Sequence, residues 1–503
     1  MWYASQSGTM LGPLAQALHE RAGIRTVLVC LEKKRILNAA RNGLEGPAIE
    51  RIVEVDSFLR ARPSTEVPDD LGSMASAFEA RHGISLVEVI RSDRHLGIDF
   101  VTGARAPRSW MAHHLAYAQI VDMALRLCEF YEQLIRETQP LAVMVYPGMM
   151  ASAALADVAA AHGIPIRGLA KGRKAANQFH WTIDKFARWW GIDDAFAKRL
   201  PVTPVPAADA KDASSRMGAP FRMQLVFDGL AKDASPRALV RSLDGLARKH
   251  IINRVRGMSY GHYLARDELR LVWDLWRWKR SLLREAPVAA TLPAEMPFVF
   301  FPLQTEPESN LMAESPMCDN QLTFLDWLCK ASPAGWYVVV KEHPGLTVPR
   351  PAGFWDRIRA YRNVIVAAGR DSAEAIADRA RLVAVINGTL GHQAAIAGRP
   401  VLTFHPYFQG RCMSHVLHAD SYETTKAELQ RVRDNALPSL DERRRAGQAY
   451  LAALDDCAFT LDDEALIRGA VGKAPISGKD AGVIAQTFLD SIAHPAAAPA
   501  RTV

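Results

Sequence analysis

Hydrophobic and polar positions in the N-terminal part of the chain alternate between helical segments and short apolar runs. The segment 7–23 has the spacing of an amphipathic helix, and the continuous apolar run at 26–32 is typical of a buried strand. The same alternation returns further along, with a helix expected at 111–137, a strand at 141–148, a helix at 151–163 and a strand at 164–170. This order of strands and helices predicts a parallel sheet with helices on both faces.

A second alternating region begins near residue 297, after a Pro- and Ala-rich break at 200–219 and a mostly helical segment. Its strands are expected at 297–304, 336–342, 363–368, 382–387 and 400–404. We therefore predict an α/β fold with two Rossmann-like domains joined by a helical connector. The predicted boundaries are 1–199 for the N-terminal domain, 200–290 for the linker and connector, 291–430 for the C-terminal domain, and 431–503 for C-terminal helices and a flexible tail.

The composition is that of a globular protein with more than one domain. A chain of 503 residues is too long for one compact core, and 49% hydrophobic and 23% charged residues are ordinary values. No apolar run approaches the roughly 18–20 residues of a membrane span, and the N-terminal stretch lacks the features of a signal peptide. The six cysteines form no ligand-like pair, so we expect reduced thiols in a cytoplasmic protein, with no metal site and no cofactor.

The net charge of +7 is unevenly spread along the chain. Residues 249–285 hold nine Lys or Arg against four Asp or Glu, a balance that favours anionic partners or simply marks the solvated side of a helix. The stretch WDLWRWKR inside this segment has two interpretations. It is either a peripheral helix at the inner membrane or a buried connector with Trp in the core and Arg at its rim, and we favour the connector. Nucleic acid is not an expected partner, because no binding motif for it is present.

Three predicted strands of the second region end in polar residues. The stretches are FPLQTEPES (301–309), KEHPG (341–345) and NGTLGHQAA (387–395). Ligands of open parallel sheets bind at the carboxyl ends of strands, so these stretches predict a site in the cleft between the two domains. Because an unpaired buried polar group costs several kcal/mol, a strand that ends in Lys, Glu and His must emerge into a polar environment.

His343 and Thr389 stand out within these stretches. Pro344 has no N–H and turns the chain out of the sheet, which presents His343 to a ligand. Gly388 permits a tight turn, and Thr389 stands where the N-cap of a helix belongs. The free N–H groups of that helix and its dipole suit a phosphate. Taken singly, a structural histidine and a plain helix cap explain the same residues.

Glu306 and Glu308 flank Pro307 in the first stretch. Carboxylates in such a loop act as a general base toward a hydroxyl, or they bind the diol of a sugar or ribose. An exposed acidic turn without a ligand is the alternative. The sequence contains no P-loop, no HExxH and no GxGxxG, and the last of these absences argues against a dinucleotide-dependent oxidoreductase.

Together the three stretches resemble a known family. Their order, with FPLQTEPE, GWYVVVKEHP and NGTLGHQAAIAGRPVL within residues 297–410, resembles the capsule polysaccharide biosynthesis family, which includes the Kdo transferases of bacterial capsule assembly. The stretch GIPIRGLAKGRKAANQF (163–179) resembles the N-terminal strand and Arg-containing loop of that family. The resemblance implies a GT-B-like fold, in which two Rossmann-like domains face a central cleft and the C-terminal one holds a nucleotide-activated donor.

The resemblance also implies roles for individual residues. His343 would contact the donor phosphate and stabilise the departing charge, with Gly388 and Thr389 as its cradle. The other positions that match donor-binding motifs are Lys341, Glu342, Pro344, Asn387, Gly391 and Gln393. Arg173 and Asn177 follow a predicted strand of the N-terminal domain, and we expect them to bind a carboxylate of the acceptor or donor. A salt bridge within the loop explains them equally well.

The same motifs resemble those that hold CMP in bacterial sialyltransferases and CDP-glycerol polymerases. The predicted function is therefore a glycosyltransferase of capsular or surface polysaccharide biosynthesis, which transfers a Kdo-like sugar from a CMP-linked donor to a glycan or glycolipid. Glu306 or Glu308 is the expected base. A CDP-polyol phosphotransferase is one alternative. A non-catalytic polysaccharide-binding or export protein is another, because Glu306 and Gln393 depart from the family pattern.

Overall fold

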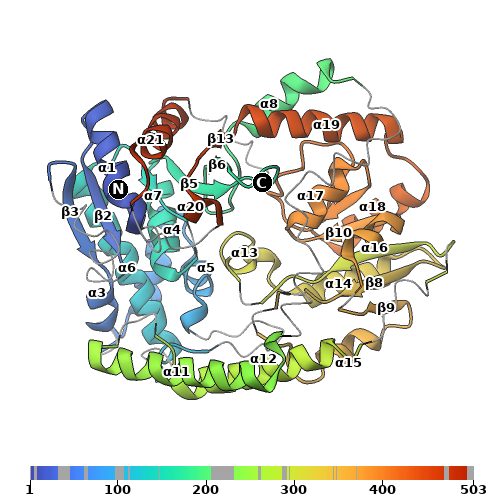
Figure 1. The fold of residues 1–503 in the computed structure, drawn as a ribbon, viewed down its shortest axis with the longest axis horizontal. Coiled ribbons are helices and arrows are strands. Elements are labelled where there is room, and N and C mark those ends of the chain that lie inside the picture. Colours follow the sequence, from blue (N-terminus) through green and yellow to red (C-terminus); the bar gives the residue numbers. More distant parts are fainter. Residues whose placement is uncertain are drawn as a thin grey trace.

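The computed structural model describes the chain at residues 2–4, 8–31, 46–61, 66–96, 107–110, 114–146, 148–204, 232–258, 262–285, 292–293, 295–306, 308–343, 345–346, 348–369, 371–468 and 475–494. Two α/β domains lie side by side, and helices α11 (Pro236–Arg256) and α12 (Ala265–Leu282) run along one edge of both (Figure 1). Each domain contains its own predominantly parallel sheet. The predicted GT-B-like arrangement of two Rossmann-like domains with a helical connector is confirmed.

The N-terminal domain is built on a sheet of seven strands in the order β13-β6-β5-β4-β1-β2-β3. Neighbours from β5 to β3 are parallel, whereas β6 pairs antiparallel with both β5 and β13. The strands are β1 (Trp2–Ala4), β2 (Thr26–Cys30), β3 (Ile49–Glu54), β4 (Val143–Met144), β5 (Ile166–Lys171), β6 (Gln178–Thr182) and β13 (Phe459–Thr460). The helices are α1 (Gly8–Ala22), α3 (Asp56–Ala61), α4 (Leu71–His82), α5 (Leu86–Arg91), α6 (Tyr117–Thr138), α7 (Met150–Ala161) and α8 (Ile192–Arg199).

The C-terminal domain contains six strands in the order β12-β11-β10-β7-β8-β9, and every neighbouring pair is parallel. The strands are β7 (Phe298–Pro302), β8 (Tyr337–Lys341), β9 (Val364–Ala367), β10 (Leu382–Val385), β11 (Val401–Thr403) and β12 (Val416–His418). The helices are α13 (Ser309–Met312), α14 (Gln321–Ala331), α15 (Phe354–Arg359), α16 (Ala373–Arg379), α17 (Thr389–Ile396), α18 (Tyr422–Arg433) and α19 (Leu440–Asp456).

Helices cover both faces of the C-terminal sheet, as the apolar runs predict. Successive side chains of a strand point to opposite faces. In β7, Phe298 and Phe300 belong to one buried cluster, and Val299 and Phe301 belong to a second cluster on the other side. The central valines of β8 divide in the same way and have no exposed surface. A strand buried on both faces needs a continuous apolar run, which is why these strands are legible in the sequence.

The C-terminal segment crosses back to the N-terminal domain. Helix α19 packs against α8 and α17, after which β13 joins the edge of the N-terminal sheet. Helix α20 (Glu464–Arg468) follows, and α21 (Gly478–Ala493) packs against α1. This crossing ties the two domains together on the side away from α11 and α12 (Figure 1). The predicted flexible tail beyond residue 494 lies outside the described residues.

The connector is a surface element and not the buried one that we favoured. Within α12 only Leu282 is buried, and Trp273 is 47% exposed. Asp267 near the start of α12 pairs with Arg108 of the N-terminal domain at 3.3 Å. Just beyond its end, Glu285 accepts a hydrogen bond from the backbone of Gly369 in the C-terminal domain at 2.8 Å. The helix therefore bridges the domains while much of its surface meets solvent. Most of the predicted linker, from residue 205 onward, lies outside the described residues.

The cysteines and the longest helices were also considered in the sequence. All six cysteines are free, and four of them are buried, as expected for thiols that fill the core. Within the ranges that the structure describes, no helix has the length and apolar character that a membrane crossing requires.

Candidate active site between the two domains

The three polar stretches predicted at strand ends meet at one edge of the C-terminal sheet. They follow β7, β8 and β10, which are adjacent in the sheet. Gln304, after β7, donates from Nε2 to the carbonyl of Asn387, after β10, at 2.7 Å. The carbonyl of Gln304 accepts from Nη2 of Arg350, in the loop after β8, at 2.6 Å. One residue therefore links the three loops.

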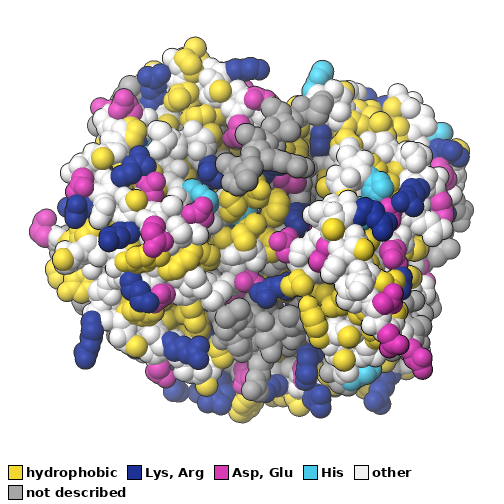
Figure 2. Space-filling model, turned by 180° about the vertical axis from the view of Figure 1, so that it is seen from behind, with side chains coloured by type: hydrophobic (Ala, Val, Ile, Leu, Met, Phe, Trp, Pro, Cys, Tyr) yellow, Lys and Arg dark blue, Asp and Glu magenta, His cyan; other side chains and the backbone are white. Residues whose placement is uncertain are grey.

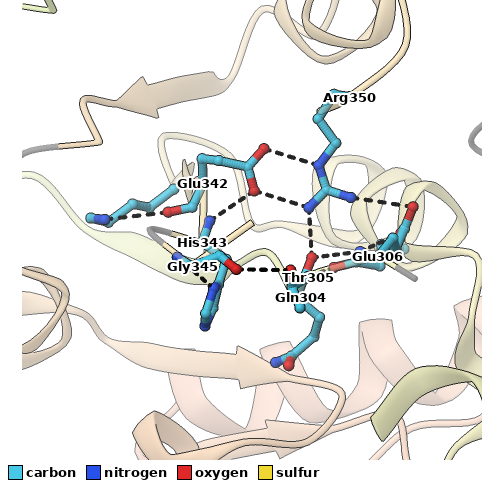
Figure 3. Close-up of polar contacts among 9 residues, drawn as sticks. Gln304, Thr305, Glu306, Glu342, His343, Gly345 and Arg350 are labelled. Carbon is cyan, nitrogen blue, oxygen red and sulfur yellow. Dashed lines mark hydrogen bonds and ion pairs between the residues drawn. The ribbon is translucent and has the colours of Figure 1, made fainter. Parts of the chain in front are cut away.

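A buried ion cluster holds the loop after β8 (Figure 3). Nε and Nη2 of Arg350 bind the two carboxylate oxygens of Glu342 at 2.9 and 3.0 Å. Nη1 of Arg350 lies 3.2 Å from Oε2 of Glu306, and none of the three side chains is more than 5% exposed. The sequence motifs did not single out Arg350, because it lies outside the three polar stretches and its partner Glu306 is on another loop.

This cluster gives structural roles to two residues predicted as ligand-binding or catalytic. Glu306 has no exposed surface, and Gln321 donates a hydrogen bond to its Oε1, so in this arrangement Glu306 does not reach an acceptor hydroxyl. Glu342 is engaged by Arg350, and its Oε1 also accepts from the backbone N–H of His343 at 2.8 Å. Both carboxylates therefore position the loop that carries His343.

Lys341 is likewise buried and engaged by the protein itself. Its side chain is 2% exposed, and Nζ donates to the carbonyl of Gly369 at 3.1 Å and to that of Glu342 at 3.3 Å. Burial lowers the pKa of Lys341, with the Glu342 carboxylate opposing that effect. The residue joins the exits of β8 and β9, and its role in this structure is to hold them in place.

His343 emerges at the end of β8 as a hydrogen-bond donor. Its Nδ1 accepts from the backbone N–H of Gly345 at 3.0 Å, so in the neutral ring the proton is on Nε2. Burial lowers the pKa of His343, which favours the neutral form. The side chain is half-buried. A neutral imidazole that donates from Nε2 is suited to a phosphate or hydroxyl oxygen of a ligand.

The turn before α17 is built by Asn387 and Gly388. Oδ1 of Asn387 accepts from the backbone N–H of Gly388 at 2.8 Å, and its Nδ2 donates to Asn310 at 2.8 Å. Gly388 has a φ of 107°, and a Cβ there would lie 3.2 Å from Nε2 of Gln304. Only glycine adopts this conformation without strain. The N-cap of α17 is Gly388 and not, as the sequence predicted, Thr389, because the turn places Thr389 inside the helix as its first residue. The backbone N–H groups of this first turn lack helical partners.

Two other predicted donor-binding positions lie within α17. Gly391 faces the core, because a Cβ there would lie 2.8 Å from Val385 and 3.1 Å from Phe408. The absence of a side chain at Gly391 lets α17 pack closely against Val385 and Phe408. Gln393 is half-buried in the same helix. His392 between them is fully buried and stacks on Phe408 with a centroid distance of 4.4 Å.

Arg173 reaches the start of α17 from the other domain. Its Nη1 donates to Oγ1 of Thr389 at 2.9 Å, so the structure brings together two residues that the sequence analysis assigned to one site. Its guanidinium carbon lies 5.9 Å from the centre of the Trp189 ring. Among the described residues no carboxylate lies within 4.0 Å of the guanidinium, and burial lowers the pKa of Arg173. The described residues therefore do not form the loop salt bridge that was the alternative explanation for Arg173.

Acidic and phenolic side chains lie near Arg173. Tyr146, which follows β4, donates a hydrogen bond from its hydroxyl to Oε1 of Glu314 in the C-terminal domain. Burial raises the pKa of Tyr146, and the negative charges of Glu314 and Glu308 raise it further. The positive charge of Arg173 opposes this shift. Burial also raises the pKa values of Glu308 and Glu314. Glu308 and Glu314 are two carboxylates near Tyr146, and sequence reasoning identified only the first.

One predicted residue, Asn177, lies apart from this group. The carbonyl of Asn177 accepts from the backbone of Leu461 at 3.1 Å, which places it beside the C-terminal segment. Pro344 lies outside the described residues, and so does Pro307. A surface hollow of about 570 Å³, lined by Trp336, Arg381, Arg443 and others, lies at the amino ends of the C-terminal strands. It is at the opposite edge of the sheet from the residues described here.

One family model matches part of the chain. Residues 249–440 match the model described as Capsule polysaccharide biosynthesis protein. The match begins within α11 and ends at the start of α19, so it includes α12 and the six-stranded sheet with all three loops of the site. The resemblance to this family expected from the sequence is confirmed over this segment. No curated protein matches the chain.

Several solved structures are similar over most of the chain at low identity. The beta Kdo 2,7 transferase of KpsC from Thermosulfurimonas dismutans is 14% identical, with a TM-score of 0.29, 72% of this chain covered and 89% of that one. The beta Kdo 2,4 transferase of the same protein is 13% identical, with a TM-score of 0.29 and coverages of 62% and 80%. A UDP-GlcNAc 2-epimerase from Neisseria meningitidis is 10% identical, with a TM-score of 0.25 and coverages of 91% and 99%.

Proposed function

We propose that this chain is a nucleotide-sugar-dependent glycosyltransferase of capsular or surface polysaccharide biosynthesis. The donor that we propose is a CMP-linked, Kdo-like sugar, and the acceptor is a glycan or glycolipid. The observation that carries the proposal is the contact between Arg173 and Thr389, which sets an unpaired cation at the N-terminus of α17. The family match over the C-terminal domain supports it.

The charges in this region suit an anionic donor. A partly buried guanidinium without a carboxylate partner is costly unless an anion binds it. The first N–H groups of α17 add donors and a favourable dipole at the same place. His343 adds a neutral N–H from the end of β8. We propose that these groups bind the donor phosphate, and that Arg173 also pairs with the carboxylate of a Kdo-like sugar.

The proposed reaction breaks the bond between the anomeric carbon and the phosphate oxygen. The acceptor hydroxyl forms the new bond to that carbon, and the released electron pair leaves on the phosphate of CMP. Donors aimed at that oxygen lower the barrier, and removing one such group typically costs on the order of 10²–10³ in rate. The proton of the acceptor hydroxyl passes to a base.

Glu308 is the base that we propose. Glu306, the other residue predicted for this role, is enclosed by Arg350 and Gln321. Glu308 is half-buried, and burial raises its pKa, which makes its carboxylate a stronger proton acceptor than an exposed one. Glu314 lies nearby but accepts a hydrogen bond from Tyr146. We propose that Glu314 holds Tyr146 in place across the domain interface.

A thermal-shift series with CMP, CDP, UDP and GDP tests the nucleotide site. A ligand at about 100 times its Kd stabilises the folded state by about 2.7 kcal/mol, which raises the Tm visibly. We expect CMP to raise the Tm of the wild type and to lose this effect in His343→Ala and in Arg173→Ala. Arg357→Ala, at an exposed arginine on α15, is the matched control and should respond like the wild type.

The other outcomes distinguish the rival functions. A shift with UDP alone would retain a nucleotide-sugar transferase and reject the CMP-linked donor. No shift with any nucleotide, together with binding of polysaccharide, would favour the non-catalytic binding protein. Release of CMP from CDP-glycerol, and not from a CMP-linked sugar, would identify the CDP-polyol phosphotransferase.

We also propose that the connector rests on an anionic membrane surface, where a glycolipid acceptor is anchored. Val240, Ile251 and Val255 share one face of α11 and are 65%, 64% and 84% exposed. Their spacing of 11 and 4 residues places them on one stripe. Four arginines lie on the same helix around this stripe, namely Arg237, Arg241, Arg248 and Arg254. Lys and Arg side chains line the lower edge of the molecule in Figure 2, where Figure 1 places α11 and α12.

Sedimentation with vesicles tests the membrane contact. We expect the wild type to sediment with vesicles of phosphatidylglycerol and phosphatidylcholine, and to do so less as salt increases, because the attraction is partly electrostatic. Val255→Asp should abolish sedimentation. Val202→Asp, at a 73% exposed valine outside this face, is the matched control. Equal sedimentation of both variants would reject the contact.

A further inference from the structure

Two helices of the N-terminal domain end in the same three residues. Helix α4 ends at His82, followed by Gly83 and Ile84, and α7 is followed by His162, Gly163 and Ile164. Gly83 has a φ of 64° and Gly163 a φ of 68°, so both helices terminate in a left-handed glycine. The same local ending therefore presents a histidine at the last turn of each helix.

The two histidines meet at one carboxylate. Nε2 of His82 lies 3.5 Å from Oε1 of Glu132, and Nε2 of His162 lies 3.6 Å from the same oxygen. Glu132 is on α6, so the three side chains come from three helices. Each residue offers one ligand atom, and these atoms all lie within 4.8 Å of one another. The rings of the two histidines are 5.8 Å apart.

One of these groups is a buried nitrogen that forms no hydrogen bond. The side chain of His82 is 9% exposed, and within the described residues its Nε2 makes no hydrogen bond, although Oε1 of Glu132 lies 3.5 Å away. Its ring packs on Phe78 with a centroid distance of 4.5 Å. A buried nitrogen lone pair or N–H without a partner is unfavourable. A ligand at this position would remove that cost.

We propose that His82, Glu132 and His162 bind a divalent transition-metal ion, with Zn²⁺ as the best match. Two imidazoles and one carboxylate form a donor set that suits this ion. Ligand atoms about 2.0–2.1 Å from a tetrahedral Zn²⁺ lie about 3.3 Å from one another. The separations of 3.5 and 3.6 Å are close to this value, so small side-chain movements complete the site. His162 is 26% exposed, which leaves the fourth position to water.

The surroundings contain both signs of charge, because the cations Arg81 and Arg136 lie near His82, whereas the helix ends contribute negative partial charge. His82 and His162 lie at the C-termini of their helices, where the helix dipole is negative. Glu132 also accepts a hydrogen bond from Arg136, but a carboxylate has lone pairs for a metal in addition. Because α6 and α7 lead into β4 and β5, their C-termini lie at the amino ends of these strands. The proposed metal therefore stabilises the packing of three helices away from the candidate active site, and it is independent of the proposed function.

Metal titration of the full-length, chelator-treated protein tests the proposal. We expect one equivalent of Zn²⁺ by isothermal titration calorimetry and an increase in Tm. With Co²⁺ as the probe, a tetrahedral site with two nitrogen ligands gives visible d–d absorption bands. His162→Gln and Glu132→Gln should each weaken binding about tenfold or more, as even the loss of an outer-shell partner weakens metal binding by about 10–100-fold.

His494→Gln, at an exposed histidine elsewhere in the structure, is the matched control and should bind as the wild type does. Circular dichroism of the His162→Gln variant checks that it is folded. We expect it to fold, because the side chain of His162 is 26% exposed. Absence of a saturable site in the wild type would overturn the proposal, leaving the two histidines as helix caps. Equal Zn²⁺ affinity in the wild type and both site variants would also overturn it.

Discussion

Removing Arg350 should destabilise the C-terminal domain more than any surface substitution. Its side chain is 2% exposed, and it binds Glu342 through two contacts and Glu306 through a third. Arg350→Leu leaves both carboxylates buried without a cation. Breaking a buried ion pair in this way costs about 3–5 kcal/mol. At roughly 2–4 °C per kcal/mol for a domain of this size, the Tm should fall by about 6–20 °C.

Differential scanning fluorimetry with urea unfolding as a second probe measures this change. Arg350→Lys should lie between the wild type and Arg350→Leu, because an ammonium keeps the charge but not the paired geometry. Adding Glu342→Gln to Arg350→Leu should recover part of the loss, since it removes one of the uncompensated charges. Arg357→Leu, at an exposed arginine, should change stability by no more than about 0.5 kcal/mol. A Tm for Arg350→Leu within about 2 °C of the wild type would refute the structural role assigned to the cluster.

Three further predictions concern packing and pH. Gly447→Ala should destabilise the protein by at least about 1–3 kcal/mol, because its Cβ would lie 2.1 Å from the carbonyl oxygen of Ile396. Gly245→Ala has open space around it and should stabilise α11 by about 1 kcal/mol. Thermal melts of both variants measure this contrast. If Glu308 is the base, kcat/KM should fall as the pH falls through its raised pKa. A pH profile that is unchanged in Glu308→Gln would contradict the assignment. The folded-state pKa of Glu314 is also raised. Its contribution to the free energy of unfolding is therefore present at low pH and is lost as the pH rises through the folded-state pKa. Urea unfolding at several pH values measures this loss.

The sequence by itself determined the elements whose residues are buried on both sides. Val338, Val339 and Val340 have no exposed surface, and their apolar run marked β8 without any knowledge of its neighbours. The polar residues that end the strands marked the edge of the sheet where the loops converge. Gly388 was recognisable as a turn residue, because the conformation of the turn depends on the local backbone alone. Periodicity and turn chemistry are local properties, so the sequence displays them.

Short elements and exposure were harder to infer. Strand β1 lies in the middle of the N-terminal sheet, yet its three residues are too few to show a period. The Trp-rich helix α12 was expected to be buried, but the domains contact it on one side only. How much of an amphipathic helix meets solvent depends on the elements around it, which its own sequence does not record.

Only the tertiary structure decided which polar residues work together. Glu306 appeared equivalent to Glu308 in the sequence, and the position of Arg350 made one a buried ion-pair partner and left the other near the domain interface. The contact between Arg173 and Thr389 likewise joins two domains. Ion pairing and burial depend on distances in space between segments far apart in the chain. Local patterns identify the candidates, and the fold determines the role of each.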